Sequence, residues 1–200
     1  MRPRLPPNQV LTKKFPVLDL GVKPPIDLKT WRFKVWGAVE RPVEWSWEEF
    51  RSLPRTGLTA DFHCVTRWSR FDLSWRGVAV QTILETVNPK PEAAYLIQHC
   101  AEGYTTNTTL ADASGADCLL ADELEGGPLP HEHGGPLRML IPKLYAWKSG
   151  KFLVGLELSL TDKPGYWETR GYHNHADPWL EERFSDPAAP PPGADGHPPL

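Results

Sequence analysis

Apolar residues recur along this chain with two different spacings, and each spacing predicts a different element. Residues 31–35 alternate apolar and basic side chains, which is the period of a half-buried strand. A second set has the i, i+3, i+4, i+7 spacing of one helix face. This set comprises Val80, Ile83, Leu84 and Val87. We therefore predict a helix of about ten residues at this position.

Short apolar runs bounded by turn-forming residues predict further strands. These runs occupy residues 58–63, 94–99, 118–121, 137–141 and 152–160. The Gly-Gly-Pro run at 126–128 predicts a turn between two of them. Ser46 and Glu49 have the spacing of a capping box, so a short helix is predicted from 47 to 53. Together these elements predict an α+β fold with mixed β-sheets, short helices and long irregular connections.

The two ends of the chain differ in composition from its middle. Residues 1–29 contain six prolines, which predict an extended arm that wraps the surface. Residues 186–200 are dominated by Pro, Ala and Gly without periodicity, which predicts a disordered or draped tail. The remaining segment, 30–185, is predicted to form one domain, because a chain of 200 residues can bury a single sizeable core.

Charge and hydropathy argue against several classes of protein. A net charge of −3 and a pI of about 6.2 are unusual for a protein that binds nucleic acid or a membrane surface. No stretch approaches the ~18 consecutive apolar residues that a transmembrane helix needs. Residues 1–7 show neither the apolar segment nor the cleavage site of a signal peptide, so we expect a cytoplasmic protein.

The chain has three cysteines: Cys64, Cys100 and Cys118. An odd number of cysteines in a chain too long to need disulfides argues against a disulfide framework, so we expect reduced thiols. Two of them are interpreted as small buried apolar residues. Cys64 differs because Arg67 and Arg70 follow it closely and can lower a thiol pKa or hold an anion. Its thiolate would be a soft ligand for a metal that binds other sulfur atoms. The alternative is a buried structural cysteine beside surface arginines.

A second stretch, about 70 residues further along the chain, has the chemistry of an anion site. Gly134 and Gly135 let the backbone approach a ligand closely, and Arg138 offers a planar fork that fits a phosphate. Residues 149–151 add a hydroxyl, an exposed N–H and a charge, which together make an anion-binding nest. The alternative is a glycine-rich hairpin with solvated basic residues.

The two stretches together resemble the molybdenum domain of the sulfite oxidase superfamily, and in particular its small stand-alone bacterial members of the YedY/MsrP-like type. The resemblance covers residues 5–184 and has many ordered pieces. These are residues 5–9, 15–18, 31–33, 64–69, 126–130, 133–138, 147–151, 171–174 and 177–179. The resemblance implies a single molybdopterin-binding domain of the sulfite oxidase type.

The resemblance also implies a cofactor of molybdenum and molybdopterin, with Cys64 as the one protein ligand to the metal. The implied cofactor-contacting residues are His133, Arg138, Lys148, Ser149, Gly150 and Lys151. The first two match contacts to the pterin and its phosphate, the last three match a loop that closes over the cofactor, and Lys148 precedes that loop. Tyr104 is a candidate to face the substrate, as a tyrosine does in sulfite oxidases, with ordinary packing as the alternative.

The implied activity is transfer of an oxygen atom to or from a small oxyanion, S-oxide or N-oxide substrate, which Arg67 and Arg70 would attract. Residues 65–68, Val-Thr-Arg-Trp, stand where true sulfite oxidases have a Gly-Asn-Arg-Arg run, and this difference argues against sulfite as the substrate. The haem and dimerisation domains of the animal enzymes are absent. We therefore expect electrons to be exchanged with an external electron-transfer protein or a membrane subunit.

Two other functions are considered. One is a catalytically inert pterin-binding or interaction domain that keeps the fold. The other is a zinc hydrolase built on the paired histidines at 131 and 133 and at 173 and 175, although their spacing does not supply a closed ligand set.

Overall fold

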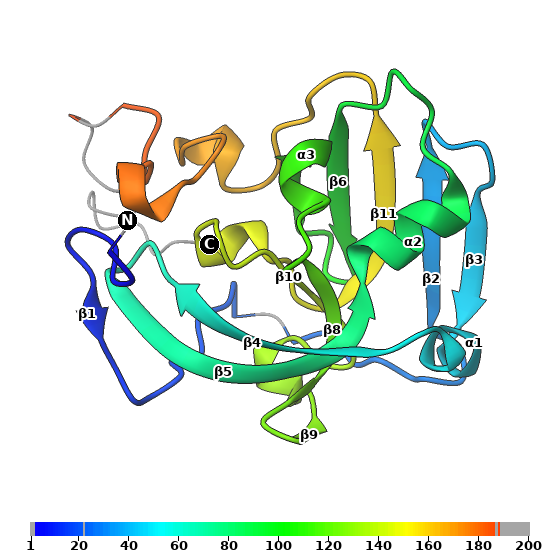
Figure 1. The fold of residues 1–200 in the computed structure, drawn as a ribbon, viewed down its shortest axis with the longest axis horizontal. Helices are drawn as coiled ribbons and strands as arrows, with labels where there is room; N and C mark the ends of the chain where they lie inside the picture. The colour runs from blue at the N-terminus through cyan, green and yellow to red at the C-terminus, as the bar shows by residue number, and fades with distance from the viewer. Residues whose placement is uncertain (1–2, 22, 187, 189–200) are drawn as a thin grey trace.

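The computed structural model describes residues 3–21, 23–186 and 188, and its strands form two sheets (Figure 1). The six-stranded sheet contains β1 (Val10–Leu11), β4 (Thr56–His63), β5 (Trp68–Ala79), β8 (Leu119–Leu124), β9 (Gly127–Pro128) and β10 (Arg138–Leu140). The five-stranded sheet contains β2 (Arg32–Gly37), β3 (Val43–Ser46), β6 (Tyr95–Cys100), β7 (Thr105–Thr109) and β11 (Leu153–Ser159).

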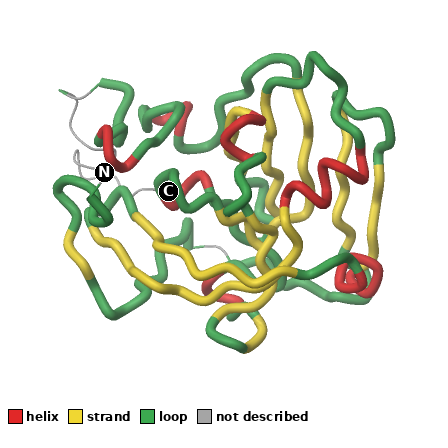
Figure 2. Tube along the Cα trace, in the orientation of Figure 1, coloured by secondary structure: helices red, strands yellow, loops and turns green. Residues whose placement is uncertain are grey.

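The helices are short, and long irregular segments connect the elements (Figure 2). The α-helices are α1 (Trp47–Ser52), α2 (Val80–Val87) and α3 (Leu110–Ala113), and the 3₁₀ helices are η1 (His131–His133), η2 (Ala146–Lys148), η3 (Glu168–Arg170) and η4 (Pro178–Leu180). Within the described residues, none of these helices has the length and apolar character needed to span a bilayer. The predicted α+β fold with mixed sheets and irregular connections is confirmed.

The five-stranded sheet has the order β3-β2-β11-β6-β7. β11 runs parallel to β2 and antiparallel to β6. In β2, Phe33 and Val35 are fully buried while Arg32 and Lys34 face solvent, so the predicted alternation at 31–35 is confirmed. This face of the sheet contributes to the larger of the hydrophobic cores.

Helix α2 covers this sheet, crossing it in Figure 1. All four residues of its predicted apolar stripe are buried in the same core as Phe33 and Val35, which confirms the helix. The shorter helix α1 has the predicted capping box: Ser46 Oγ accepts from the Glu49 N–H, and the Glu49 carboxylate accepts from the Ser46 N–H at 2.7 Å.

Strands β4 and β5 form a long antiparallel pair that extends away from the five-stranded sheet (Figure 1). The turn between them begins at Cys64, whose N–H donates to Trp68 O at 2.9 Å while its carbonyl accepts from the Arg67 N–H at 3.1 Å. Arg67 has a φ of 70°, the left-handed conformation that closes this turn. The structure therefore places Cys64 at the end of β4, as the strand prediction for 58–63 expected.

The twelve-residue strand β5 was not predicted, because Ser69, Arg70 and Asp72 interrupt the apolar positions of its first half. Its alternation is nevertheless present, since Leu73 and Trp75 are buried and the residues on either side of Trp75 are exposed. The polar positions face solvent, so they are compatible with a strand that is buried on one side. β7, a run of Thr and Asn, was also not predicted.

The N-terminal arm is attached to the body through β1, which pairs in parallel with the start of β5. Thr12 continues this attachment, since its N–H donates to Ser69 O at 2.9 Å. The arm then passes across one side of the molecule before entering β2 (Figure 1). In the predicted C-terminal tail, residue 187 and residues 189–200 lie outside the part of the chain that is described.

Candidate cofactor site

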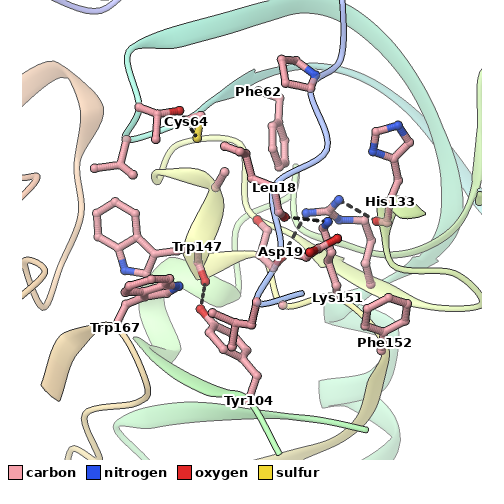
Figure 3. A pocket seen from close by; sticks show the side chains of 18 of the residues that line it. Leu18, Asp19, Phe62, Cys64, Tyr104, His133, Trp147, Lys151, Phe152 and Trp167 are labelled. Atoms are coloured by element: carbon pink, nitrogen blue, oxygen red, sulfur yellow. Dashed lines mark hydrogen bonds between the residues drawn. The ribbon is translucent and has the colours of Figure 1, made fainter. Parts of the chain in front are cut away.

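One cavity of about 230 Å³ connects the Cys64 turn with the glycine-rich basic stretch. Seven residues singled out in the sequence line it: Cys64, Tyr104, His133, Arg138, Ser149, Gly150 and Lys151. Figure 3 shows Cys64 on one side, His133 and Lys151 on the other, and Leu18 in the foreground between them. The thiol and the basic loop, distant in the sequence, therefore share one cavity.

Cys64 is buried, and both its backbone N–H and its carbonyl are hydrogen-bonded. Besides the turn bonds, its carbonyl accepts from Gln9 Nε2 at 3.0 Å. The thiol lies 3.2 Å from Thr66 Oγ1, the nearest polar side-chain atom in the turn. Burial raises the pKa of the Cys64 thiol, so a bound cation, rather than the protein alone, would be needed to keep it ionised.

Arg138 is a buried cation in the wall of the cavity. Its guanidinium donates to His133 O at 2.8 Å and to Ser149 O at 3.0 Å, and it lies over the ring of Phe62. Among residues 3–21 and 23–186, no carboxylate forms an ion pair with it. Burial lowers the pKa of Arg138 to about 10, so it remains positive at neutral pH. A buried charge without a counter-ion favours an anionic occupant of the adjoining space.

His133 and Lys151 stand beside Arg138 in this basic wall. Burial and the nearby Arg138 charge lower the pKa of His133, which favours the neutral imidazole. Burial, followed by repulsion from Arg138, lowers the pKa of Lys151 to about 8. Both shifts have the sign expected where positive charges gather without enough negative charge, and a bound anion would reverse them.

The loop at 149–151 is fixed by hydrogen bonds to the protein, and the exposed N–H predicted there is wrong for Gly150, because β6 supplies its acceptor. Ser149 Oγ accepts from the Ile141 N–H at 3.0 Å, and the Gly150 N–H donates to Gln98 Oε1 at 2.8 Å. A Cβ at Gly150 would lie 2.9 Å from Cys100 Sγ, closer than real Cβ contacts. Glycine is therefore required at position 150 by packing against β6.

Three predicted site residues do not line this cavity: Arg67, Arg70 and Lys148. Arg67 is exposed in the turn after Cys64, and Arg70 Nη1 donates to Phe71 O at 3.0 Å. Lys148 is fully buried and its Nζ lies 2.6 Å from Glu168 Oε1, in an ion pair behind the cavity wall. The geometry thus supports the basic loop more strongly than the two arginines as a ligand-contacting element.

Tyr104 lines the cavity, but its hydroxyl donates to Trp147 O at 2.6 Å and is therefore already engaged. Sequence reasoning missed Tyr172, which lines the same cavity together with Trp147 and Trp167. Burial, and then the charge of Cys64, raise the pKa of Tyr172 to about 12. Its hydroxyl is a neutral hydrogen-bond donor on the side of the cavity nearest the thiol.

Two acidic side chains and part of the arm also belong to the wall and were not predicted. Glu102 lines the cavity, its Oε2 is buried without a hydrogen-bond partner, and burial raises its pKa to about 7. Phe15, Leu18 and Asp19 reach the cavity from the N-terminal arm. The available sequence signal was the Phe-Pro pair within a polar, proline-rich segment, which was noted in the resemblance but not assigned a role.

Of the paired histidines, His133 lines the cavity and the other three have partners elsewhere. The ring of His131 lies 3.0 Å from Pro24 O, and His173 and His175 both contact Glu182. In the part of the chain that the structure describes, no three His, Cys, Asp or Glu side chains converge on one point that could hold a metal. All three cysteines are free and buried, as expected of reduced thiols.

Comparisons with known proteins agree with this geometry. The profile of the family described as "Oxidoreductase molybdopterin binding domain" matches residues 20–167. The "Uncharacterized oxidoreductase YuiH" of Bacillus subtilis (strain 168) is 45% identical over 183 residues, covering 91% of this chain and 92% of that protein. The "Putative protein-methionine-sulfoxide reductase subunit YedZ1" of Azospira oryzae is 29% identical over 171 residues, covering 84% of this chain and 64% of that protein.

Among solved structures, the sulfane dehydrogenase SoxCD from Paracoccus pantotrophus matches with a TM-score of 0.66 and 19% sequence identity. The match covers 82% of this chain and 48% of the SoxCD chain. At this identity the likeness concerns the fold, which is shared over most of the chain.

Proposed function

Because the chain belongs to the oxidoreductase molybdopterin-binding domain family, we propose that it holds molybdenum through Cys64 and transfers an oxygen atom to or from a small substrate. Family membership makes it a molybdopterin-dependent oxidoreductase with a sulfite oxidase-type fold, so the predicted family, fold and enzyme class are confirmed. The identity of the metal, the class of substrate and the electron-transfer partner are our proposals.

The chemistry of the cavity fits this cofactor. The cavity wall provides one thiol, and the described residues form no cluster of three metal-binding side chains, so a metal beside Cys64 needs ligands from outside the protein. A pterin with two dithiolene sulfurs supplies such ligands, and soft sulfur donors suit the same metal as a thiolate. The unpaired Arg138 on the same cavity fits the phosphate of that cofactor.

The observation that carries the proposal is this single space shared by Cys64 and Arg138. When bound, the cofactor supplies two-electron oxygen-atom chemistry, while the protein binds it and sets its surroundings. Cys64 would hold the metal, and Arg138, His133, Lys151 and the loop at 149–151 would hold the pterin and its phosphate.

The substrate end of the cavity is aromatic and carries a neutral donor. Trp147, Trp167 and Tyr172 exclude water from the space beside Cys64, and the Tyr172 hydroxyl can donate to an S-oxide or N-oxide oxygen. The name of the Azospira relative, a methionine-sulfoxide reductase subunit, supports an S-oxide substrate over sulfite. That name also supports electron exchange with a separate protein or membrane subunit, and we propose that this chain acts in the cytoplasm.

Elemental analysis and a pair of cysteine variants test the proposal. Protein from a molybdenum-replete host is expected to contain molybdenum in near-stoichiometric amount and to reduce methionine sulfoxide with an artificial dye as electron donor. Cys64→Ser should keep the fold but lose both the metal and turnover. Cys118→Ser, a buried cysteine outside the cavity, is the matched control and should retain both. Full turnover by Cys64→Ser, or a well-folded wild-type protein without molybdenum, contradicts the assignment.

A further inference from the structure

Part of the cavity wall comes from the N-terminal arm, upstream of the region that the family profile matches. The matched region begins at residue 20, whereas four wall residues precede it. They are Phe15, Pro16, Leu18 and Asp19. The arm, predicted only to wrap the surface, therefore contributes directly to the cavity that the cofactor would occupy.

Phe15 connects the arm to one residue of the basic wall. Its ring stacks on His133 with the ring centroids 4.2 Å apart and an angle of 10° between the planes. The same ring makes edge contacts with Phe62, Trp68 and Trp75, at centroid distances of 5.3 to 6.0 Å. Because Phe15 covers one face of the imidazole, it fixes the plane in which the His133 ring nitrogens can meet a ligand.

The backbone of the arm connects to a second residue of the same wall. Lys151 Nζ donates to Leu18 O at 2.8 Å and to Glu132 O at 2.9 Å, the first of which is drawn in Figure 3. An ammonium group has three N–H donors, so these two carbonyls fix its direction and leave one donor for an anion. The arm and a bound anion can therefore hold Lys151 together, without competing for it.

Between its two ends, this part of the arm makes few backbone hydrogen bonds with the rest of the protein. The Thr12 N–H donates to Ser69 O, and Pro24 O accepts a hydrogen bond from His131 Nε2 at 3.0 Å. Along residues 13–21 and 23, Leu18 O is the one backbone group in the described chain that is hydrogen-bonded to the rest of the protein. Release of residues 13–20 thus requires loss of one hydrogen bond, of the Phe15 packing, and of the contact of Leu20 with the larger core.

We propose that residues 13–20 form a strap that opens to admit the cofactor and closes over it, with Phe15 positioning His133 and the Leu18 carbonyl positioning Lys151. The inference rests on the proposed function, because it assigns the cavity to molybdopterin. Once the cofactor is bound, it adds contacts to the two residues that hold the strap, so the loaded protein favours the closed strap.

Limited trypsin digestion measures the strap directly in the wild-type protein. Lys13 and Lys14 are exposed and lie at the start of the strap, whereas the Lys23–Pro24 bond resists trypsin. Protein from a host that makes molybdopterin is compared with protein from a host that does not, by mass spectrometry of the released peptide. Cleavage after Lys13 or Lys14 should be slower by about tenfold in the loaded protein, because cleavage follows the population of the open form. Cleavage after the exposed Lys29 should change little.

Variants of Phe15 separate positioning from general packing. Phe15→Leu keeps an apolar side chain but removes the stack, and after dialysis it should retain about fivefold less pterin than wild type, measured by fluorescence of the acid-released pterin. Phe15→Tyr preserves the stack and should restore retention. The matched control is Ile26→Ala, which lies in the same arm but packs against the larger core, away from His133. It should retain pterin.

The outcomes distinguish the two levels of the argument. Wild-type protein that contains no pterin when made in the competent host overturns the proposed function and the strap together. Wild-type protein that contains pterin, but is cleaved after Lys13 and Lys14 at the same rate as the unloaded protein, overturns the strap alone. Equal pterin retention by Phe15→Leu and wild type overturns the positioning role of Phe15.

Discussion

The ion pair between Lys148 and Glu168 predicts a large, pH-dependent loss of stability in Glu168→Gln. Both side chains are almost completely buried, with 0% and 1% exposure. Glu168 Oε1 also accepts from Trp147 Nε1 at 3.0 Å and from Thr106 Oγ1 at 2.8 Å. Glutamine can still accept these two bonds, so the substitution removes mainly the negative charge.

The size of the effect follows from the ammonium that remains. Lys148 keeps two oxygens of Asn107 as acceptors, at 2.8 and 3.1 Å, but loses its counter-ion. Breaking a buried pair in this way costs about 3–5 kcal/mol. At pH 7 the cost of burying this charge cannot exceed about 4.6 kcal/mol, which is the free energy of deprotonating a lysine with an ordinary pKa of about 10.4. If the charge cost more than that, Lys148 would become neutral instead.

The pH dependence has a definite sign. Burial lowers the pKa of Lys148 even beside Glu168, and loss of the carboxylate lowers it further. A lysine whose folded pKa is lowered destabilises the protein below that pKa, and the penalty fades as pH rises towards the unfolded pKa. The limit therefore falls by about 1.4 kcal/mol per pH unit, to about 1.9 kcal/mol at pH 9.

Urea unfolding of wild type and Glu168→Gln at pH 7 and pH 9 measures this difference. The matched control is Glu44→Gln, which removes the charge from an exposed pair with Lys34 at 3.0 Å and should cost less than about 1 kcal/mol at both pH values. A loss of stability in Glu168→Gln no larger than in the control, or one that does not shrink at pH 9, refutes the reasoning.

Two further predictions concern other buried positions. Burial lowers the pKa of His63, which lies 2.8 Å from Ser69 Oγ, to about 4. The folded state therefore binds fewer protons than the unfolded one, and about 3 kcal/mol of stability should be lost as pH falls from 6.5 to 4. Urea unfolding of His63→Gln should show a weaker dependence of stability on pH, and the same dependence as wild type contradicts the assignment. Gly150→Ala should lower the free energy of unfolding by about 1–3 kcal/mol because its Cβ would contact Cys100 Sγ. The double variant with Cys100→Ala should recover part of this stability. Strictly additive losses of stability in thermal or urea unfolding would count against the contact.

Much of the site could be predicted from side-chain types within short segments. The alternation of apolar residues predicts that β4 ends at Cys64. The glycines, Arg138 and the residues at 149–151 predict the basic side of the cavity, because they are suitable hydrogen-bond donors to an anion. Lys148 and Lys151 illustrate the limit of such reasoning. Lys148 precedes the loop at 149–151 and Lys151 ends it, but Lys148 is paired with Glu168 in the interior whereas Lys151 lines the cavity. A partner 20 residues away decides this, and no local pattern reports it.

The same limit explains the missed walls. Phe15 and Tyr172 reach the cavity through pairings between distant segments, and neither lies near Cys64 in the sequence. The strand β5 was missed for a different reason, since its polar face resembles a turn when the partner strands are unknown. Sheet pairing, rather than propensity, makes those residues a strand.

The breadth of the cavity wall has a consequence for the order of events during biosynthesis. Its residues extend from Phe15 to Tyr172, so no early portion of the nascent polypeptide can enclose the pterin. Contacts between such distant segments form late in folding, after the loops between them have closed. Capture of the prosthetic group therefore waits until the segment that contains Tyr172 has been synthesised and has packed against the rest of the wall.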